Sequence, residues 1–151
     1  MAIDELQKPP GRWCVHRKPG AGCAIYGSHP SSCQSFSCQW LLSEDLPHRL
    51  RPDYAKVVLT ADEVAGQRRL IANCDAANPF AWKRQPIYGW LKAQAIAYWG
   101  RGTIVMAKAA DRLWLIGKSE DRDLGSTDPR CSMSVGFDDS GLFVVAISPP
   151  A

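Results

Sequence analysis

The sequence predicts an α+β fold, in which an N-terminal loop region packs on a mostly antiparallel sheet with one long helix. Three observations lead to this prediction: a cysteine-rich stretch full of turn-forming residues, one long segment with helical spacing, and two pairs of apolar strands around short turns. The chain has 151 residues, and 46% of them are hydrophobic, which is typical of one globular domain. We therefore expect a single domain, 1–151, with a cysteine segment at 13–40 and an α+β body at 55–148.

The first part of the chain is expected to be short of regular structure. Residues 1–12 should form an extended lead-in, because Pro9-Pro10 disfavours a helix. Residues that favour turns interrupt the cysteine segment, namely Pro19, Gly20, Gly22, Gly27 and Pro30. The stretch 44–53 should contain one helical turn between Pro47 and Pro52.

The next element is a strand at 55–60, which is rich in β-branched residues. Two continuations remain open. Thr60 and Glu63 have the spacing of a capping box, which predicts a short helix. Alternatively, a β-turn at Asp62-Glu63 leads into a second strand near 67–72.

The longest helix is expected between Ala81 and about Trp99. Apolar side chains recur there at helical spacing, at Ile87, Trp90, Leu91, Ala95 and Tyr98. Pro86 suits the first turn of a helix, and Gly100 suits the residue just beyond its end.

Two β-hairpins are expected after this helix. The first joins strands at 103–107 and 112–117 around a turn at 108–111. The second joins strands at 132–137 and 142–147 around a turn at 138–141. The order of these elements, with one helix between strands that are adjacent in sequence, favours the α+β class.

The six cysteines are unevenly distributed. Cys14, Cys23, Cys33 and Cys38 follow the spacing C-x8-C-x9-C-x4-C, whereas Cys74 and Cys131 stand alone and are expected to be buried thiols. The N-terminus has acidic residues where a signal peptide needs a basic and then an apolar segment, so we expect a cytoplasmic protein. In a reducing compartment such a cluster is more often a metal site than a set of disulfides.

The cluster has the number of ligands that a tetrahedral thiolate site needs. We predict a metal held by Cys14, Cys23, Cys33 and Cys38, with His16 as an alternative ligand for one cysteine. Four soft thiolates suit zinc or iron, and we favour zinc because the long gaps do not resemble iron–sulfur motifs. Mononuclear iron remains the alternative, and the paired C-x2-C motifs of ordinary zinc ribbons are missing.

The residues around the four cysteines also resemble a known family. They are Trp13-Cys14-Val15-His16, Gly22-Cys23-Ala24-Ile25-Tyr26, His29-Pro30-Ser31-Ser32-Cys33 and Phe36-Ser37-Cys38-Gln39-Trp40-Leu41. These stretches are similar to the Gly-Cys-x-Ile-Tyr, Arg-Pro-x-x-Cys and Phe-x-Cys-x-Trp elements of the YkgJ-type cysteine-cluster family, which is described as a zinc- or iron-chelating domain. The chain departs from that family at Arg17, where a further cysteine is common, and at His29, where Arg usually precedes the proline. The resemblance implies metal binding and leaves the activity of the family undefined.

Function is less constrained than metal binding. The sequence has no nucleophile elbow, HExxH motif, P-loop or dinucleotide fingerprint, and no apolar stretch long enough to cross a membrane. We expect an accessory or interaction protein with a protein partner, rather than an enzyme, because four protein thiolates would close the metal site. One alternative is an iron-dependent or redox enzyme that uses the cluster. The other is an RNA-associated module that binds nucleic acid through the basic middle of the chain, at Arg68, Arg69, Lys83 and Arg84.

Overall fold

The computed structural model describes residues 3–9, 12–64, 66–126, 132–137 and 143–148. By internal contacts the chain divides into two compact units, Met1–Ser37 and Cys38–Ala151, which we call the N-terminal and C-terminal units. The predicted α+β class is confirmed, and within the described residues one helix alone is seven residues or longer. None of the described helices is long and apolar enough to cross a membrane.

The N-terminal unit consists of short elements joined by turns. Its elements are the 3-10 helix η1 (Asp4–Leu6), strands β1 (Arg17–Lys18) and β2 (Gly22–Cys23), and helix α1 (Ser31–Gln34). The extended lead-in predicted for residues 1–12 is wrong at this helix, which ends at Leu6 because Gln7 adopts a left-handed conformation with a φ of 49°. Ile3 is the one buried residue among those described in this unit.

The C-terminal unit contains all the longer elements. It opens with helix α2 (Gln39–Leu42), the 3-10 helix η2 (His48–Leu50) and helix α3 (Pro52–Ala55), where the sequence predicts one helical turn. Then follow β3 (Val57–Val64), β4 (Gln67–Cys74), η3 (Ala81–Lys83), α4 (Ile87–Tyr98), β5 (Thr103–Ala109), β6 (Arg112–Ile116), β7 (Asp121–Ser126), β8 (Ser132–Phe137) and β9 (Phe143–Ser148).

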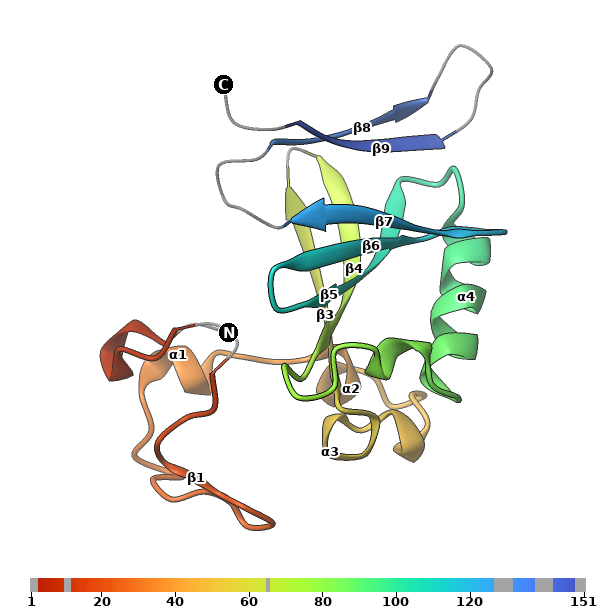
Figure 1. Ribbon diagram of the computed structural model, residues 1–151. Helices are drawn as coiled ribbons and strands as arrows, with labels where there is room; N and C mark the ends of the chain where they lie inside the picture. The colour runs from red at the N-terminus through yellow and green to blue at the C-terminus, as the bar shows by residue number, and fades with distance from the viewer. Residues whose placement is uncertain (1–2, 10–11, 65, 127–131, 138–142, 149–151) are drawn as a thin grey trace. The chain divides into compact units, whose positions relative to one another are not determined.

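Five of these strands form one sheet in the order β3-β4-β5-β6-β7, seen in Figure 1. All neighbouring pairs are antiparallel except β4 and β5, which are parallel, so the chain must cross over between them, and α4 lies in this connection. One row of paired residues, Leu59, Ala72, Ala107 and Trp114, is buried in the main core. The other face carries a second buried row of Ile71, Met106 and Leu115. Apolar side chains therefore cover both faces of the middle strands.

Helix α4 packs against the main core through Ile87, Leu91 and Ala95, three of the positions related by helical spacing. It is shorter than predicted, because residues 81–83 form η3 and the helix begins only after Pro86. Proline disfavours helical geometry in the residue before it, which prevents a continuous helix from Ala81. The helix ends as predicted, with Gly100 just beyond its C-cap at a φ of 71°.

The hairpin of β3 and β4 decides between the two sequence readings of this region. The predicted short helix after Thr60 is wrong, because Thr60 to Val64 continue strand β3. The second strand is confirmed as β4, but the chain reverses after Val64 rather than at Asp62-Glu63. Asp62 lies opposite Arg69 in this register, and the two side chains form an ion pair at 2.6 Å.

The later hairpins lie close to their predicted positions. Strands β5 and β6 pair antiparallel around Ala110 and Asp111. Strands β8 and β9 pair antiparallel, whereas the turn predicted at 138–141 lies outside the described residues. Strand β7 has no counterpart among the predicted elements, and it adds an edge strand to the sheet.

Candidate functional site

The first two cysteines lie on the short hairpin of the N-terminal unit. Cys14 begins a turn in which its carbonyl oxygen accepts a hydrogen bond from the Arg17 amide at 3.1 Å. Arg17 pairs with Cys23 across β1 and β2, and the Ala24 amide donates to the His16 carbonyl at 2.8 Å. Gly20 and Gly22 have φ values of 74° and 88°, which favour glycine, and they allow the reversal between the strands. Cys14 therefore lies just before this hairpin, and Cys23 lies on its second strand.

Cys33 lies in the first turn of α1, where its amide donates to the Pro30 carbonyl at 2.9 Å. This turn is fixed from the other side by the Glu5 carboxylate of η1. Ser31 Oγ, Ser32 Oγ and the Ser32 amide all donate to Glu5 at 2.7–3.2 Å. These hydrogen bonds connect Glu5 to residues that are 26 and 27 positions away in the sequence.

The Cys33 thiol is affected by the other two cysteines of this unit. Burial raises the pKa of the Cys33 thiol, and the charges that Cys14 and Cys23 carry when ionised raise it further. All three cysteines are free thiols rather than disulfides.

Cys38, the fourth predicted ligand, is the first residue of the C-terminal unit and the N-cap of α2. Its side chain is buried, and it too is a free thiol. Within the described ranges, no group of three or more His, Cys, Asp and Glu side chains is arranged to hold a metal ion.

The histidines have different surroundings. His16, the alternative ligand, is half-buried, and in the sequence it lies between Cys14 and the first residue of β1. His29 stacks on Tyr26 with 5.2 Å between ring centroids, and its Nδ1 accepts a hydrogen bond from the Gly27 amide. This bond leaves Nε2 as the donor nitrogen of a neutral ring.

The basic residues of the nucleic-acid alternative do not form one group. Arg68 and Arg69 are at the beginning of β4, and Arg69 is bound by both carboxylate oxygens of Asp62 at 2.6 Å. Lys83 is the last residue of η3, and Arg84 is the C-cap of that helix. The two pairs of cations therefore lie on different elements of the C-terminal unit.

One polar network of the C-terminal unit was not predicted from the sequence. Lys92 of α4 donates to Asp121 Oδ1 at 2.9 Å and to the carbonyl oxygen of Gly117 at 2.8 Å. Tyr88 donates to Asp121 Oδ2 at 2.8 Å, and this bond to the carboxylate raises the pKa of Tyr88. Residues three and four positions apart share a helix face, which could have suggested that Tyr88 and Lys92 act together but not that Asp121 is their partner.

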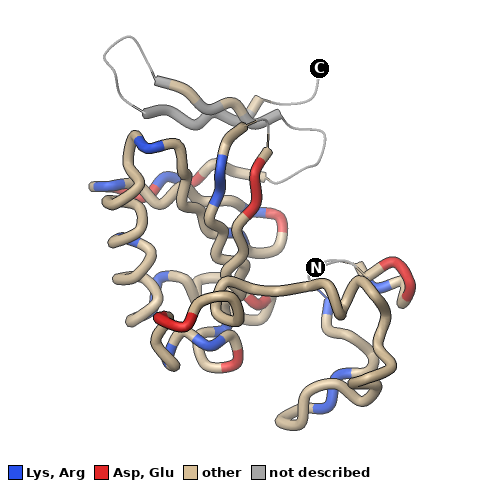
Figure 2. The backbone as a smooth tube through the Cα atoms, turned by 180° about the vertical axis from the view of Figure 1, so that it is seen from behind, with Lys and Arg blue, Asp and Glu red and all other residues tan. Residues whose placement is uncertain are grey.

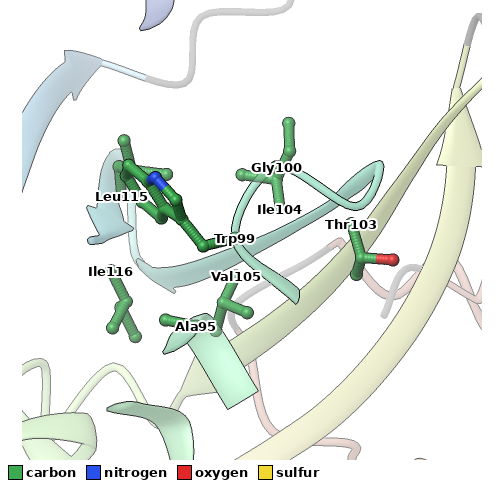
Figure 3. A pocket seen from close by; sticks show the side chains of 8 residues that line it. All are labelled: Ala95, Trp99, Gly100, Thr103, Ile104, Val105, Leu115 and Ile116. Carbon is green, nitrogen blue, oxygen red and sulfur yellow. The ribbon is translucent and has the colours of Figure 1, made fainter. Parts of the chain in front are cut away.

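The hollow drawn in Figure 3 lies where α4 is followed by β5 and β6. Its lining is mostly apolar, and Thr103 contributes the one side-chain hydroxyl among the labelled residues. A cavity volume of about 10 Å³ is roughly the room that one water molecule needs.

Cys74, elsewhere in this unit, is half-buried, and burial raises the pKa of its thiol to about 11. Cys131 lies outside the described residues.

Comparisons with family models, with curated proteins and with solved structures give no match to this chain. The resemblance to the YkgJ-type family therefore stays a prediction from the residues around the four cysteines.

Proposed function

We propose that the protein is a small metal-binding accessory protein whose N-terminal unit is organised by one structural metal. Cys14, Cys23, Cys33 and Cys38 are the proposed ligands, and His16 is the alternative to one of them. The observation that carries this proposal is a unit of 37 residues that has three free thiols, Cys14, Cys23 and Cys33, and one buried residue, Ile3, among those described. Domains below about 40 residues usually need a metal, disulfides or a partner chain to fold.

Zinc suits these donors better than the hard cations. Thiolates are soft ligands that select zinc, copper(I) or iron, whereas magnesium and calcium need oxygen. The charges of ionised Cys14 and Cys23 raise the pKa of the Cys33 thiol, and a bound divalent cation would offset them, so the metal favours the thiolate form. Four protein ligands close a zinc site and leave no position for substrate, which favours a structural over a catalytic role. Iron remains the alternative metal.

The proposed setting is the cytoplasm, where thiols stay reduced and available to a metal. The proposed partner is another protein, for which the metal-bound loops supply a rigid surface. Both statements follow from the chemistry of free thiols and from the proposed structural role of the metal.

The test is metal analysis of the full chain, purified without added metal under reducing conditions. We expect about one zinc per chain, as one four-coordinate site requires. Cys14→Ser, Cys23→Ser, Cys33→Ser and Cys38→Ser, made one at a time, should each lose the metal. Cys74→Ser is the matched control, since Cys74 is a free thiol outside the proposed ligand set, and it should keep the metal.

The outcomes separate the alternatives. Visible absorption that dithionite bleaches would replace zinc by iron, because zinc has neither colour nor redox chemistry. If His16→Ala loses the metal and one of the cysteine variants keeps it, the ligand set contains His16 in place of that cysteine. Substoichiometric metal in the unchanged protein, with disulfides among the four cysteines, would overturn the proposal.

A further inference from the structure

The N-terminal unit exposes two large aromatic side chains. Trp13 is 62% exposed and Tyr26 is 84% exposed, although both residues are next to or near a thiol of the proposed site. Tyr26 follows Cys23 closely, and its amide donates to the Cys23 carbonyl at 3.4 Å. Two large exposed rings in one small unit are more typical of a surface that binds a partner than of a solvated surface.

The same unit is basic around these rings. Between Leu6 and Ser43 the sequence contains no Asp or Glu, and it contains Lys8, Arg12, Arg17 and Lys18. The two acidic residues of the unit, Asp4 and Glu5, come before this stretch, and Figure 2 shows the red segment of the unit close to the N-terminus. The Glu5 carboxylate is already bound by Ser31 and Ser32. A polyanion would therefore meet cations without nearby competing carboxylates.

The arrangement at Trp13 combines a ring and a cation. The turn closed by the Cys14 carbonyl folds Arg17 back, and its guanidinium lies 3.9 Å from the centroid of the Trp13 ring. With one ring face covered in this way, an exposed fraction of 62% means that the opposite face is open to solvent. A flat base can stack there while the guanidinium contacts a phosphate.

We propose that the N-terminal unit binds single-stranded nucleic acid. Trp13 and Tyr26 stack on bases, and Arg17 and Lys18 contact phosphates of the same strand. An acidic peptide would satisfy the cations but would make no use of the two exposed ring faces. A duplex would offer phosphates but keep its bases stacked inside, so single strands fit the observations better.

This inference goes beyond the proposed metal site and assigns nucleic-acid binding to a different part of the chain from the basic middle. Arg69 is neutralised by Asp62, and the two pairs of cations in the middle lie on different elements, β4 and η3. The N-terminal unit, by contrast, has its cations on and beside one short hairpin, together with the exposed rings.

The test measures binding of labelled oligouridine and oligodeoxythymidine of about 10 nucleotides, within the usual site sizes, by fluorescence anisotropy. The full chain is used at about 50 mM salt, from one preparation with known metal content. Trp13→Leu and Tyr26→Leu should each weaken binding by about 5- to 100-fold, the range for losing one stacked base. Trp13→Phe should retain most of the affinity, because a ring remains. Higher salt should weaken binding of the unchanged protein, as released counterions require.

The following controls show whether a loss of binding comes from the substituted side chain. Both leucine variants replace exposed residues, and circular dichroism should show an unchanged fold. The Arg68→Ala/Lys83→Ala variant should bind like the unchanged protein, and a loss confined to this variant would overturn the assignment. Absence of oligonucleotide binding, equal affinity of Trp13→Leu, or equal affinity for a duplex of the same length would also overturn it. Binding to phosphatidylserine vesicles in place of oligonucleotides would identify a lipid surface instead. Because metal content is measured separately, failure of the metal proposal and failure of this one are distinguishable.

Discussion

Glu5 joins the start of the chain to helix α1 through hydrogen bonds alone. Three donors of Ser31 and Ser32 bind its carboxylate, and the Ser32 hydroxyl contributes most to lowering the pKa of Glu5 to about 2. These donors favour the ionised carboxylate, because protonation removes an acceptor that each of them uses. Cys33 follows directly in the same turn, so Glu5 helps to position a proposed metal ligand.

The lowered pKa of Glu5 predicts a pH dependence at the residue scale. A carboxyl group with a depressed folded-state pKa contributes stability above its unfolded pKa of about 4.3 and loses it as the pH falls through the folded value. The Ser32 amide resonance, followed by NMR from pH 5 downward, should therefore shift with a midpoint near 2. Glu5→Gln should remove this titration. A midpoint near 4.3 in the unchanged protein would show that the three hydrogen bonds do not hold in solution.

At the scale of elements, Lys92 joins α4 to the turn after β6 and to β7. The side chains of Lys92 and its partner Asp121 are 19% and 15% exposed, so neither is well solvated. Lys92→Met should reduce the free energy of unfolding by about 1–3 kcal/mol, because Asp121 loses a charged donor in a poorly solvated position. Urea denaturation with an unchanged slope measures this loss.

The control for Lys92 is Lys118→Met, in the exposed turn before β7, where a change within about 0.5 kcal/mol is expected. In a double-mutant cycle of Lys92→Met and Asp121→Asn, the loss of stability in the double variant should differ from the sum of the two single losses, because the two side chains interact. Equal losses for Lys92→Met and Lys118→Met would mean that the network contributes nothing specific to the packing of α4.

The elements show which sequence signals prevail. Thr60 and Glu63 have the spacing of a cap, but pairing of β3 with β4 buries Leu59 in the core and sets Asp62 against Arg69. Tertiary pairing therefore overrides a local capping signal. Hairpins such as β5 and β6 are predictable because the turn and both strands are adjacent in sequence.

Contacts between residues that are distant in the sequence could not be predicted, because no local pattern of residues specifies them. The parallel pairing of β4 with β5 joins residues separated by the whole of α4, and no local pattern encodes it. Strand β7 contains Asp121, Arg122 and Asp123 and lacks apolar alternation, yet charged residues suit an edge strand. The cysteines of the candidate site were visible from spacing, whereas the partners of Glu5 and Lys92 depend on contacts distant in sequence.

At the scale of the whole molecule, the two units depend on different sources of stability. The C-terminal unit buries apolar side chains on both faces of its sheet, including Trp82, Leu91 and Met106. The N-terminal unit has a buried Ile3, a short hairpin and the hydrogen bonds of Glu5 in the part that the structure describes. Loss of a metal should therefore affect the two units unequally.

Removal of the proposed metal should loosen the N-terminal unit while the C-terminal unit stays folded. When ligands lie on loops, the free energy of metal binding is largely free energy of folding, and the N-terminal unit has little burial to replace it. Hydrogen exchange of the full chain should become about tenfold faster or more at residues 12–37 when a strong chelator is added. Amides of β4 and β5, in the middle of the sheet, should keep their protection. Cys23→Ser should show the fast exchange without chelator, and Cys74→Ser should behave as the unchanged protein. Equal protection of residues 12–37 with and without chelator would contradict a structural metal, and simultaneous loss of protection at β4 and β5 would contradict the independence of the two units.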